Sequence, residues 1–111
     1  MMKGIRGATT VSENSIDDIK TATLELFFKL VDENNLKEEN VSHIIFSFTK
    51  DITKAYPAKF VREHWKNVAM MCFNEADIEN SLKMCIRILI VAECESKPKF
   101  VYINGAKDLR K

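Results

Sequence analysis

The chain has 111 residues, 46% of them hydrophobic, and this size predicts one domain with a single core across residues 1–111. Lysine and arginine number 17 against 16 aspartate and glutamate, without a block of like charge, which excludes an extended basic surface for nucleic acid or for an anionic membrane. No apolar run approaches the length of a membrane span and the first residues show no apolar leader pattern, so we expect a cytoplasmic protein.

The first half of the chain predicts a strand, a long helix and a second strand. The segment "KGIRGATTV" ends in β-branched residues and predicts a strand that runs into a turn. Ser15 and Asp18 have the spacing of a capping box, and the helix that follows should end near "ENNLK". "HIIFSF" is typical of a strand. The expected buried face of the helix comprises Ile16, Ile19, Thr23, Leu26, Phe27, Leu30 and Val31.

The second half predicts a short helix and three strands. Pro57 suits a first helical turn, so we expect a helix from Pro57 to about His64 that carries Lys59, Arg62 and Glu63 within one turn. "NVAMMCF" and "LKMCIRILIVA" predict strands on either side of the polar turn "NEADIENS", and "KFVYI" predicts a last strand before a turn at Asn104-Gly105. This order of elements predicts an α+β fold with helices on one face of a sheet.

The cysteines do not have the spacing of a disulfide framework or a zinc site. Cys72, Cys85 and Cys94 are odd in number and contain no C-x-x-C pair, and only His43 and His64 could join them. We therefore expect free thiols and no metal site.

Arg87 lies within the longest apolar strand and poses the main question of the sequence. The residues that alternate with it also include Leu89 and Val91, so both faces of the strand are largely apolar, and the second face should meet another subunit or close a cavity. A charge in such surroundings needs an anionic partner. The candidates are Glu75, Glu93, a carboxylate of a neighbouring subunit, or a ligand.

Arginine is rare in this chain and points to a small anion. Only four of the 17 cationic residues are arginines, and the planar guanidinium is preferred where a carboxylate must be held at two points. Without a basic surface, such residues favour a small polyanionic metabolite over a polymer. The four arginines are Arg6, Arg62, Arg87 and Arg110.

Four segments resemble the AroH-class chorismate mutases in order and spacing. They are "GIRGATTV", "YPAKFVRE", "CFNEADIENSLKMCIRILI" and "VYINGAKDLR", and together they extend from the first residues to Arg110. The resemblance implies a mixed sheet of ferredoxin-like or chorismate-mutase type, assembled as a homotrimeric pseudo-barrel with active sites in the clefts between subunits. It also implies the Claisen rearrangement of chorismate to prephenate, in phenylalanine and tyrosine biosynthesis, without a cofactor or metal.

The same resemblance assigns roles to individual residues. Arg87 matches the donor to the ether oxygen, Arg6 and Tyr102 match residues that meet a substrate carboxylate, and Glu75 and Cys72 match groups near the ring hydroxyl. Residues that match the cleft edge and the segment over the ligand are Tyr56, Lys59, Arg62, Met71, Leu109 and Arg110. Each also has an ordinary structural interpretation, as a surface charge, a core cysteine or a half-buried strand tyrosine.

The sequence departs from the family pattern at several positions and is also compatible with two other functions. Tyr56 replaces the usual phenylalanine, Met71 replaces a small polar residue, and Asn80-Ser81 takes the place of a glycine-rich turn. One alternative is an imine deaminase of a trimeric family with similar architecture, which would release ammonia from imines. The other is a non-catalytic trimer that binds an aromatic-pathway metabolite.

Overall fold

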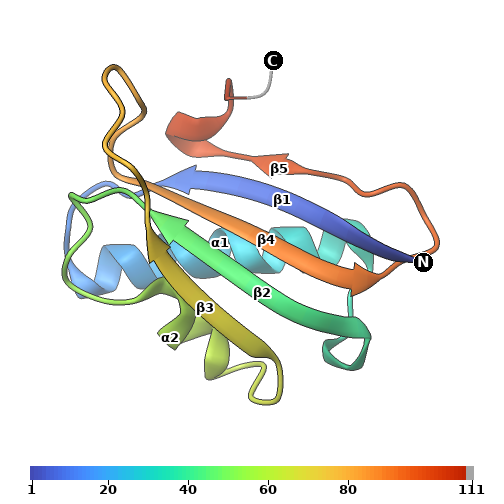
Figure 1. The fold of residues 1–111 in the computed structure, drawn as a ribbon. Coiled ribbons are helices and arrows are strands. Elements are labelled where there is room, and N and C mark those ends of the chain that lie inside the picture. The colour runs from blue at the N-terminus through green and yellow to red at the C-terminus, as the bar shows by residue number, and fades with distance from the viewer. Residues whose placement is uncertain (110–111) are drawn as a thin grey trace.

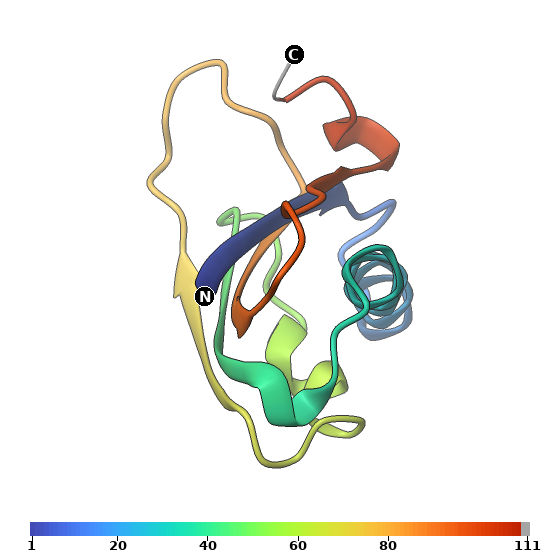
Figure 2. The ribbon, with the colours of Figure 1, turned by 90° about the vertical axis from the view of Figure 1, so that its right-hand side faces the viewer.

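A five-stranded mixed sheet carries two helices on one of its faces in the computed structural model, which describes residues 1–109 (Figures 1 and 2). The elements are β1 (Met2–Thr10), α1 (Ile16–Asn34), β2 (Val41–Phe48), α2 (Pro57–Arg62), β3 (Ala69–Asn74), β4 (Cys85–Glu93) and β5 (Val101–Tyr102). Short 3-10 turns cover Glu38–Asn40 and Asn104–Ala106. The predicted α+β class with helices on one face is confirmed.

The strand order is β3-β2-β4-β1-β5. β4 is antiparallel to both of its neighbours, β1 and β2, whereas β3 and β5 lie parallel to β2 and β1 at the two edges. The chain order β-α-β-α-β-β-β differs from the β-α-β-β-α-β order of a ferredoxin-like fold, so the ferredoxin-like part of the prediction is wrong. What the two folds share is a split βαβ unit, here β1-α1-β2 with β4 inserted between its strands.

Local signals at both ends of α1 explain why its bounds were predictable. The Ser15 hydroxyl accepts a hydrogen bond from the Asp18 N–H at 3.1 Å, as the capping motif requires. Asn35 adopts a left-handed conformation with φ of 51°, and the following N–H of Leu36 donates to the Val31 carbonyl at 3.0 Å, which closes the helix. Ile16 is an exception to the predicted buried face, because 55% of it is exposed.

The core lies between the helices and one face of the sheet. Ile19, Leu26 and Leu30 of α1 are fully buried, and the Phe27 ring meets the Trp65 ring edge-on at 4.9 Å, which joins α1 to the segment after α2. Gly7 allows α1 and β5 to approach β1 closely, since a Cβ there would lie 2.9 Å from both a Leu30 methyl and the Val101 carbonyl oxygen. The "RGATT" motif therefore contains a packing glycine.

β4 alternates as predicted. The residues that face the core are buried at Ile86, Ile88, Ile90 and Ala92, whereas Arg87, Leu89 and Val91 on the opposite face are only half-buried. The bounds of three elements differ from the prediction: α2 ends at Arg62 rather than near His64, β4 begins at Cys85 rather than at Leu82, and β5 contains only Val101 and Tyr102.

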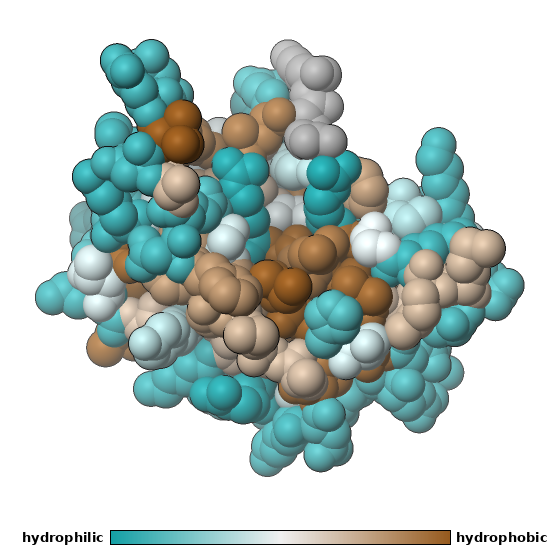
Figure 3. All heavy atoms as spheres, viewed as in Figure 1, coloured by the Kyte–Doolittle hydropathy of each residue, from teal (hydrophilic) through white to brown (hydrophobic). Residues whose placement is uncertain are grey.

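The sheet face away from the helices is open and partly apolar. Figure 3 shows apolar side chains gathered over the middle of this face, with hydrophilic side chains around them. Met71 and Phe73 of β3 and Phe100 before β5 are 59%, 48% and 43% exposed. We refer to this surface as the open face.

Candidate active site

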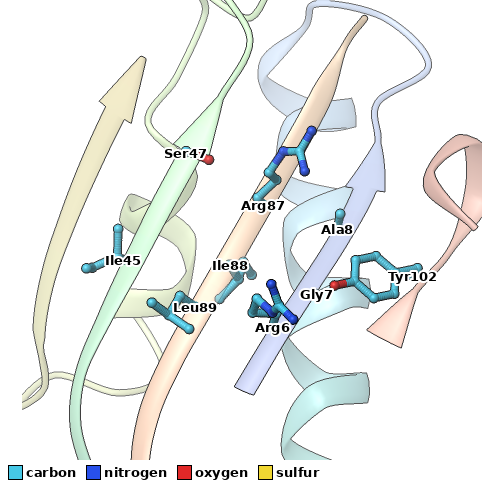
Figure 4. Close-up of a pocket in the computed structure, with 9 residues that line it drawn as sticks. All are labelled: Arg6, Gly7, Ala8, Ile45, Ser47, Arg87, Ile88, Leu89 and Tyr102. Carbon is cyan, nitrogen blue, oxygen red and sulfur yellow. The ribbon is translucent and has the colours of Figure 1, made fainter. Parts of the chain in front are cut away.

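A hollow of about 220 Å³ on the open face brings three of the predicted site residues together (Figure 4). Arg6 comes from β1, Arg87 from β4 and Tyr102 from β5. These strands are adjacent, with Ala8 directly opposite Arg87 on one side and beside Tyr102 on the other. The remaining lining residues are Gly7, Ala8, Ile45, Ser47, Ile88 and Leu89.

Arg87 has an anionic partner within its own chain. Its Nε donates to Oε2 of Glu75 at 3.0 Å, and the two side chains are 42% and 19% exposed. Of the partners that the sequence left open, the structure therefore contains Glu75. Because Arg87 contacts Glu75 only through Nε, the ion pair is monodentate (single-pointed) rather than bidentate. This leaves the terminal nitrogens outside that hydrogen bond.

Arg6 and Tyr102 are held by neighbours on the open face. The Arg6 guanidinium lies over the Phe100 ring, 4.8 Å from its centroid. This cation–π contact stabilises the positive charge of Arg6. Tyr102 packs beside a small buried cluster of Ala8, Cys85 and Ala106, and Leu109 packs against the same cluster. The last described residue thus lies near one wall of the hollow.

The connection before β4 fixes the strand that carries Arg87. Met84 has a left-handed backbone with φ of 51°, and its N–H donates to both carboxylate oxygens of Asp51, at 3.2 and 3.0 Å. The Thr49 hydroxyl donates to the same carboxylate at 2.5 Å and accepts from the Cys85 N–H at 3.0 Å. These contacts hold the backbone that begins three residues before Arg87.

A second group of predicted site residues lies around α2. Tyr56 and Lys59 line a hollow of about 520 Å³ together with Phe48 and the exposed Ile16. The Tyr56 ring meets the Phe48 ring edge-on at 6.5 Å. The additional residues of this lining are Ile52, Thr53, Lys54, Ala55 and Asn74, and none of them lines the first hollow.

Cys72 belongs to the second group rather than to the open face. It is half-buried and packs against the core, opposite Phe46 in the β2–β3 pairing. Burial raises the pKa of its thiol, while the Ala58 backbone and the positive charge of Arg62 act in the lowering direction. At neutral pH the thiol is therefore protonated. In this form it can donate a hydrogen bond, whereas nucleophilic attack would require the thiolate.

The two groups do not meet within one chain. Glu75 joins Arg6, Arg87 and Tyr102, whereas Tyr56, Lys59, Arg62 and Cys72 cluster at the edge formed by α2 and the helix side of β3. Met71 is on the open face of β3, opposite Ile45, and lines neither hollow. Arg110 lies outside the described residues.

Ser47 is a polar residue of the first hollow that was not predicted from the sequence. Its hydroxyl donates to Oε2 of Glu75 at 2.7 Å. The signal in the sequence was a single serine within the apolar strand "HIIFSF", on the same side as Ile45 by strand alternation.

The described part of the chain contains neither a cluster of metal ligands nor a helix that could cross a membrane. Among residues 1–109, no group of three or more histidine, cysteine, aspartate or glutamate side chains could hold a metal ion. Neither α1 nor α2 combines the length and the apolar content that a membrane crossing requires. The three cysteines are free, as expected.

Comparison with known proteins identifies the family. The model for "Chorismate mutase type I" matches residues 2–111. The chorismate mutase AroH of Bacillus subtilis (strain 168) is 38% identical, over 99% of this chain and 91% of that protein. The chain belongs to the chorismate mutase type I family. The family predicted from the four segments is thus confirmed.

Two further comparisons agree with this family. The chorismate mutase AroH of Thermus thermophilus is 33% identical, over 99% of this chain and 94% of that protein. A solved chorismate mutase from Clostridium thermocellum matches with a TM-score of 0.91 and 41% identity, covering 95% of this chain and 97% of that one. One departure from the family pattern has a structural reason: Asn80 adopts a φ of 65°, a left-handed conformation that asparagine tolerates in place of glycine.

Proposed function

We propose that this protein is a chorismate mutase, an isomerase that converts chorismate to prephenate on the route to phenylalanine and tyrosine. The observation that carries the proposal is the gathering of Arg6, Arg87 and Tyr102 around one hollow, with Glu75 paired to Arg87, in a chain of this family. We further propose that residues 1–111 form a single mutase domain and that the enzyme works in the cytoplasm.

The reaction needs positioning and electrostatic stabilisation rather than a nucleophile. Chorismate is a flexible dianion that must be held in its compact reactive conformer, and negative charge develops on the ether oxygen as the C–O bond breaks. In the proposed arrangement, the terminal nitrogens of Arg87 donate to that oxygen. Because the site is partly shielded from water, a fixed guanidinium stabilises the transition state more than the ground state.

The other residues of the open face hold the substrate. Arg6 and the Tyr102 phenol donate to its carboxylates, and Glu75 accepts a hydrogen bond from the ring hydroxyl. The half-exposed Arg87–Glu75 pair supports these roles, since Arg87 keeps a compensating charge when the site is empty. We propose that Leu109 and Arg110 contact the bound ligand.

We propose a homotrimer because one chain supplies two separate halves of a site. The open face of one subunit contributes Arg6, Glu75, Arg87 and Tyr102, and the neighbouring subunit contributes the cleft edge around α2. The exposed apolar side chains of Met71, Phe73 and Phe100 support burial of the open face in an assembly. The cleft-edge residues in this proposal are Tyr56, Lys59, Arg62 and Cys72, whereas Met71 belongs to the open face.

The proposal is tested by incubating purified protein with chorismate and identifying the product. Prephenate as the product of a saturable reaction supports the mutase. Binding of chorismate or prephenate without turnover would instead indicate a metabolite-binding trimer. The imine deaminase is not retained, because the family model and the relatives described above are all named as chorismate mutases.

A further inference from the structure

A three-residue contact on the open face extends beyond the residues that the family resemblance provides. Ser47 of β2 lies directly opposite Arg87 of β4 in the sheet and lines the same hollow. The Ser47 hydroxyl donates to Oε2 of Glu75 at 2.7 Å, and Arg87 Nε donates to that same oxygen at 3.0 Å. In Figure 4 the Ser47 hydroxyl points toward the strand that carries Arg87.

We propose that Ser47 is a positioning residue that fixes the Glu75 carboxylate, and through it Arg87, for the mutase reaction. This inference rests on the proposed function. Two donors on Oε2 satisfy that oxygen and leave Oε1 as the acceptor for the substrate hydroxyl. The same contact keeps Arg87 bound through Nε, so that its terminal nitrogens face the substrate.

The backbone around Glu75 explains why such a residue is needed. Glu75 is the first residue after β3, and its N–H donates to the Phe48 carbonyl at 2.8 Å, which fixes its main chain. The long side chain still has freely rotating bonds, and a carboxylate near a guanidinium favours a two-point pair with the terminal nitrogens. Such a pair would occupy the nitrogens that the ether oxygen needs. Ser47 holds the carboxylate in the single-pointed geometry instead.

The test compares steady-state kinetics of Ser47 variants with chorismate. Ser47→Ala should lower kcat about tenfold, equivalent to about 1.4 kcal/mol of transition-state stabilisation. Ser47→Thr retains a hydroxyl and should stay within about threefold of wild type. The matched control is Ser42→Ala, which removes an exposed serine from the same strand and should leave kcat unchanged.

A double-mutant cycle separates positioning from a merely structural role. If Ser47 acts through Glu75, Ser47→Ala should change kcat less than about twofold when Glu75→Ala is already present. An equal tenfold loss in both backgrounds would overturn the inference, because Ser47 would then act independently of Glu75. Wild-type kcat in Ser47→Ala would overturn it as well.

Folding controls and a second substitution separate loss of function from loss of structure. Circular dichroism and the oligomeric state of each variant show whether it folds, and if Ser47→Ala does not, Ser47→Cys keeps the volume with only a weak donor and should show the same loss. Full activity of Ser47→Cys would contradict the inference. If wild-type protein does not convert chorismate, the proposed function and this inference both fail, whereas an active wild type with unaffected Ser47 variants removes only the inference.

Discussion

Arg87 retains its charge on a largely apolar strand because Glu75 compensates for it at 3.0 Å and because the open face leaves 42% of its side chain exposed. The sequence indicated that Arg87 needed an anion but could not choose between a protein carboxylate and a ligand. The structure supplies the first, and the proposed mechanism adds the second. An arginine that is paired through Nε, with its terminal nitrogens outside that hydrogen bond, can serve both.

Replacement of Arg87 tests the electrostatic role at a single residue. Arg87→Ala should leave the protein folded and lower kcat by roughly 10²-fold or more, the usual effect of removing a fixed donor to developing charge. Lys83→Ala, which removes an exposed cation just before β4, is the control. Turnover of Arg87→Ala near the wild-type value would rule out the proposed role.

Cys72 distinguishes hydrogen bonding from covalent chemistry. Burial raises the pKa of the thiol, so the protonated form dominates at neutral pH. Cys72→Ser should therefore retain most of the kcat measured with chorismate, since a hydroxyl preserves the hydrogen-bonding group. A complete loss of activity in a folded variant would argue for covalent catalysis.

Cys85 links alkaline pH to stability. Burial raises the pKa of its thiol to about 11 from a usual value of 9.0. Above pH 9 the unfolded chain loses this proton while the folded chain keeps it, so the free energy of unfolding should fall as the pH rises from 9 to 11, by about 2–3 kcal/mol in full. Urea unfolding at fixed protein concentration measures this slope, and Cys85→Ala should flatten it. Identical slopes in both proteins would contradict the assignment.

The secondary-structure elements were more predictable from the sequence than the long-range pairing of the strands. Ser15 and the asparagines after α1 are local signals, so the helix bounds followed from the sequence. β5 was predicted too long because "KFVYI" is typical of a strand, although only Val101 and Tyr102 pair with β1. Ile16 was predicted to be buried because helical periodicity gives a face, but the periodicity does not reveal where the core beneath that face ends.

The contact between Asp51 and Met84 holds the start of β4, the strand that carries Arg87. Asp51→Ala removes both acceptors of the Met84 N–H and leaves a left-handed residue without its partner at the start of β4. The free energy of unfolding should fall by about 1–3 kcal/mol, measured by urea titration. Glu79→Ala removes an exposed carboxylate from the β3–β4 connection, which also contains Met84. It should change the free energy of unfolding by less than about 0.5 kcal/mol. Equal effects of the two variants would mean that the contact contributes nothing.

Across the whole molecule, the sequence suggested candidate site residues but not the face of the sheet on which each one lies. Strand alternation put Arg87 on the less buried side of β4, yet "AMMCFN" is apolar enough on both sides that the direction of Cys72 was undetermined. Only the packed fold separates Cys72 and Tyr56 from Arg87 and Tyr102. Ser47 was missed for a related reason, because its partner Glu75 follows a different strand.

The proposed division of the site into two halves predicts that inactive variants restore each other. Arg62→Ala and Arg87→Ala damage different halves, so a trimer that mixes them can pair two intact halves at one interface. After joint unfolding and refolding in equal amounts, roughly a quarter of the interfaces should be intact, with about that share of the wild-type rate at low chorismate concentration. A mixture no more active than its two components would argue that each site lies within one subunit.

Conversion of chorismate to prephenate by the side chains of this protein alone can be tested by the rate at which chorismate is lost. Purified wild-type protein, dialysed against a metal chelator and assayed without added cofactor, should consume chorismate in a saturable reaction and form an equal amount of prephenate. Saturable binding of chorismate without any prephenate would contradict the claim and leave a protein of mutase fold that only binds the metabolite.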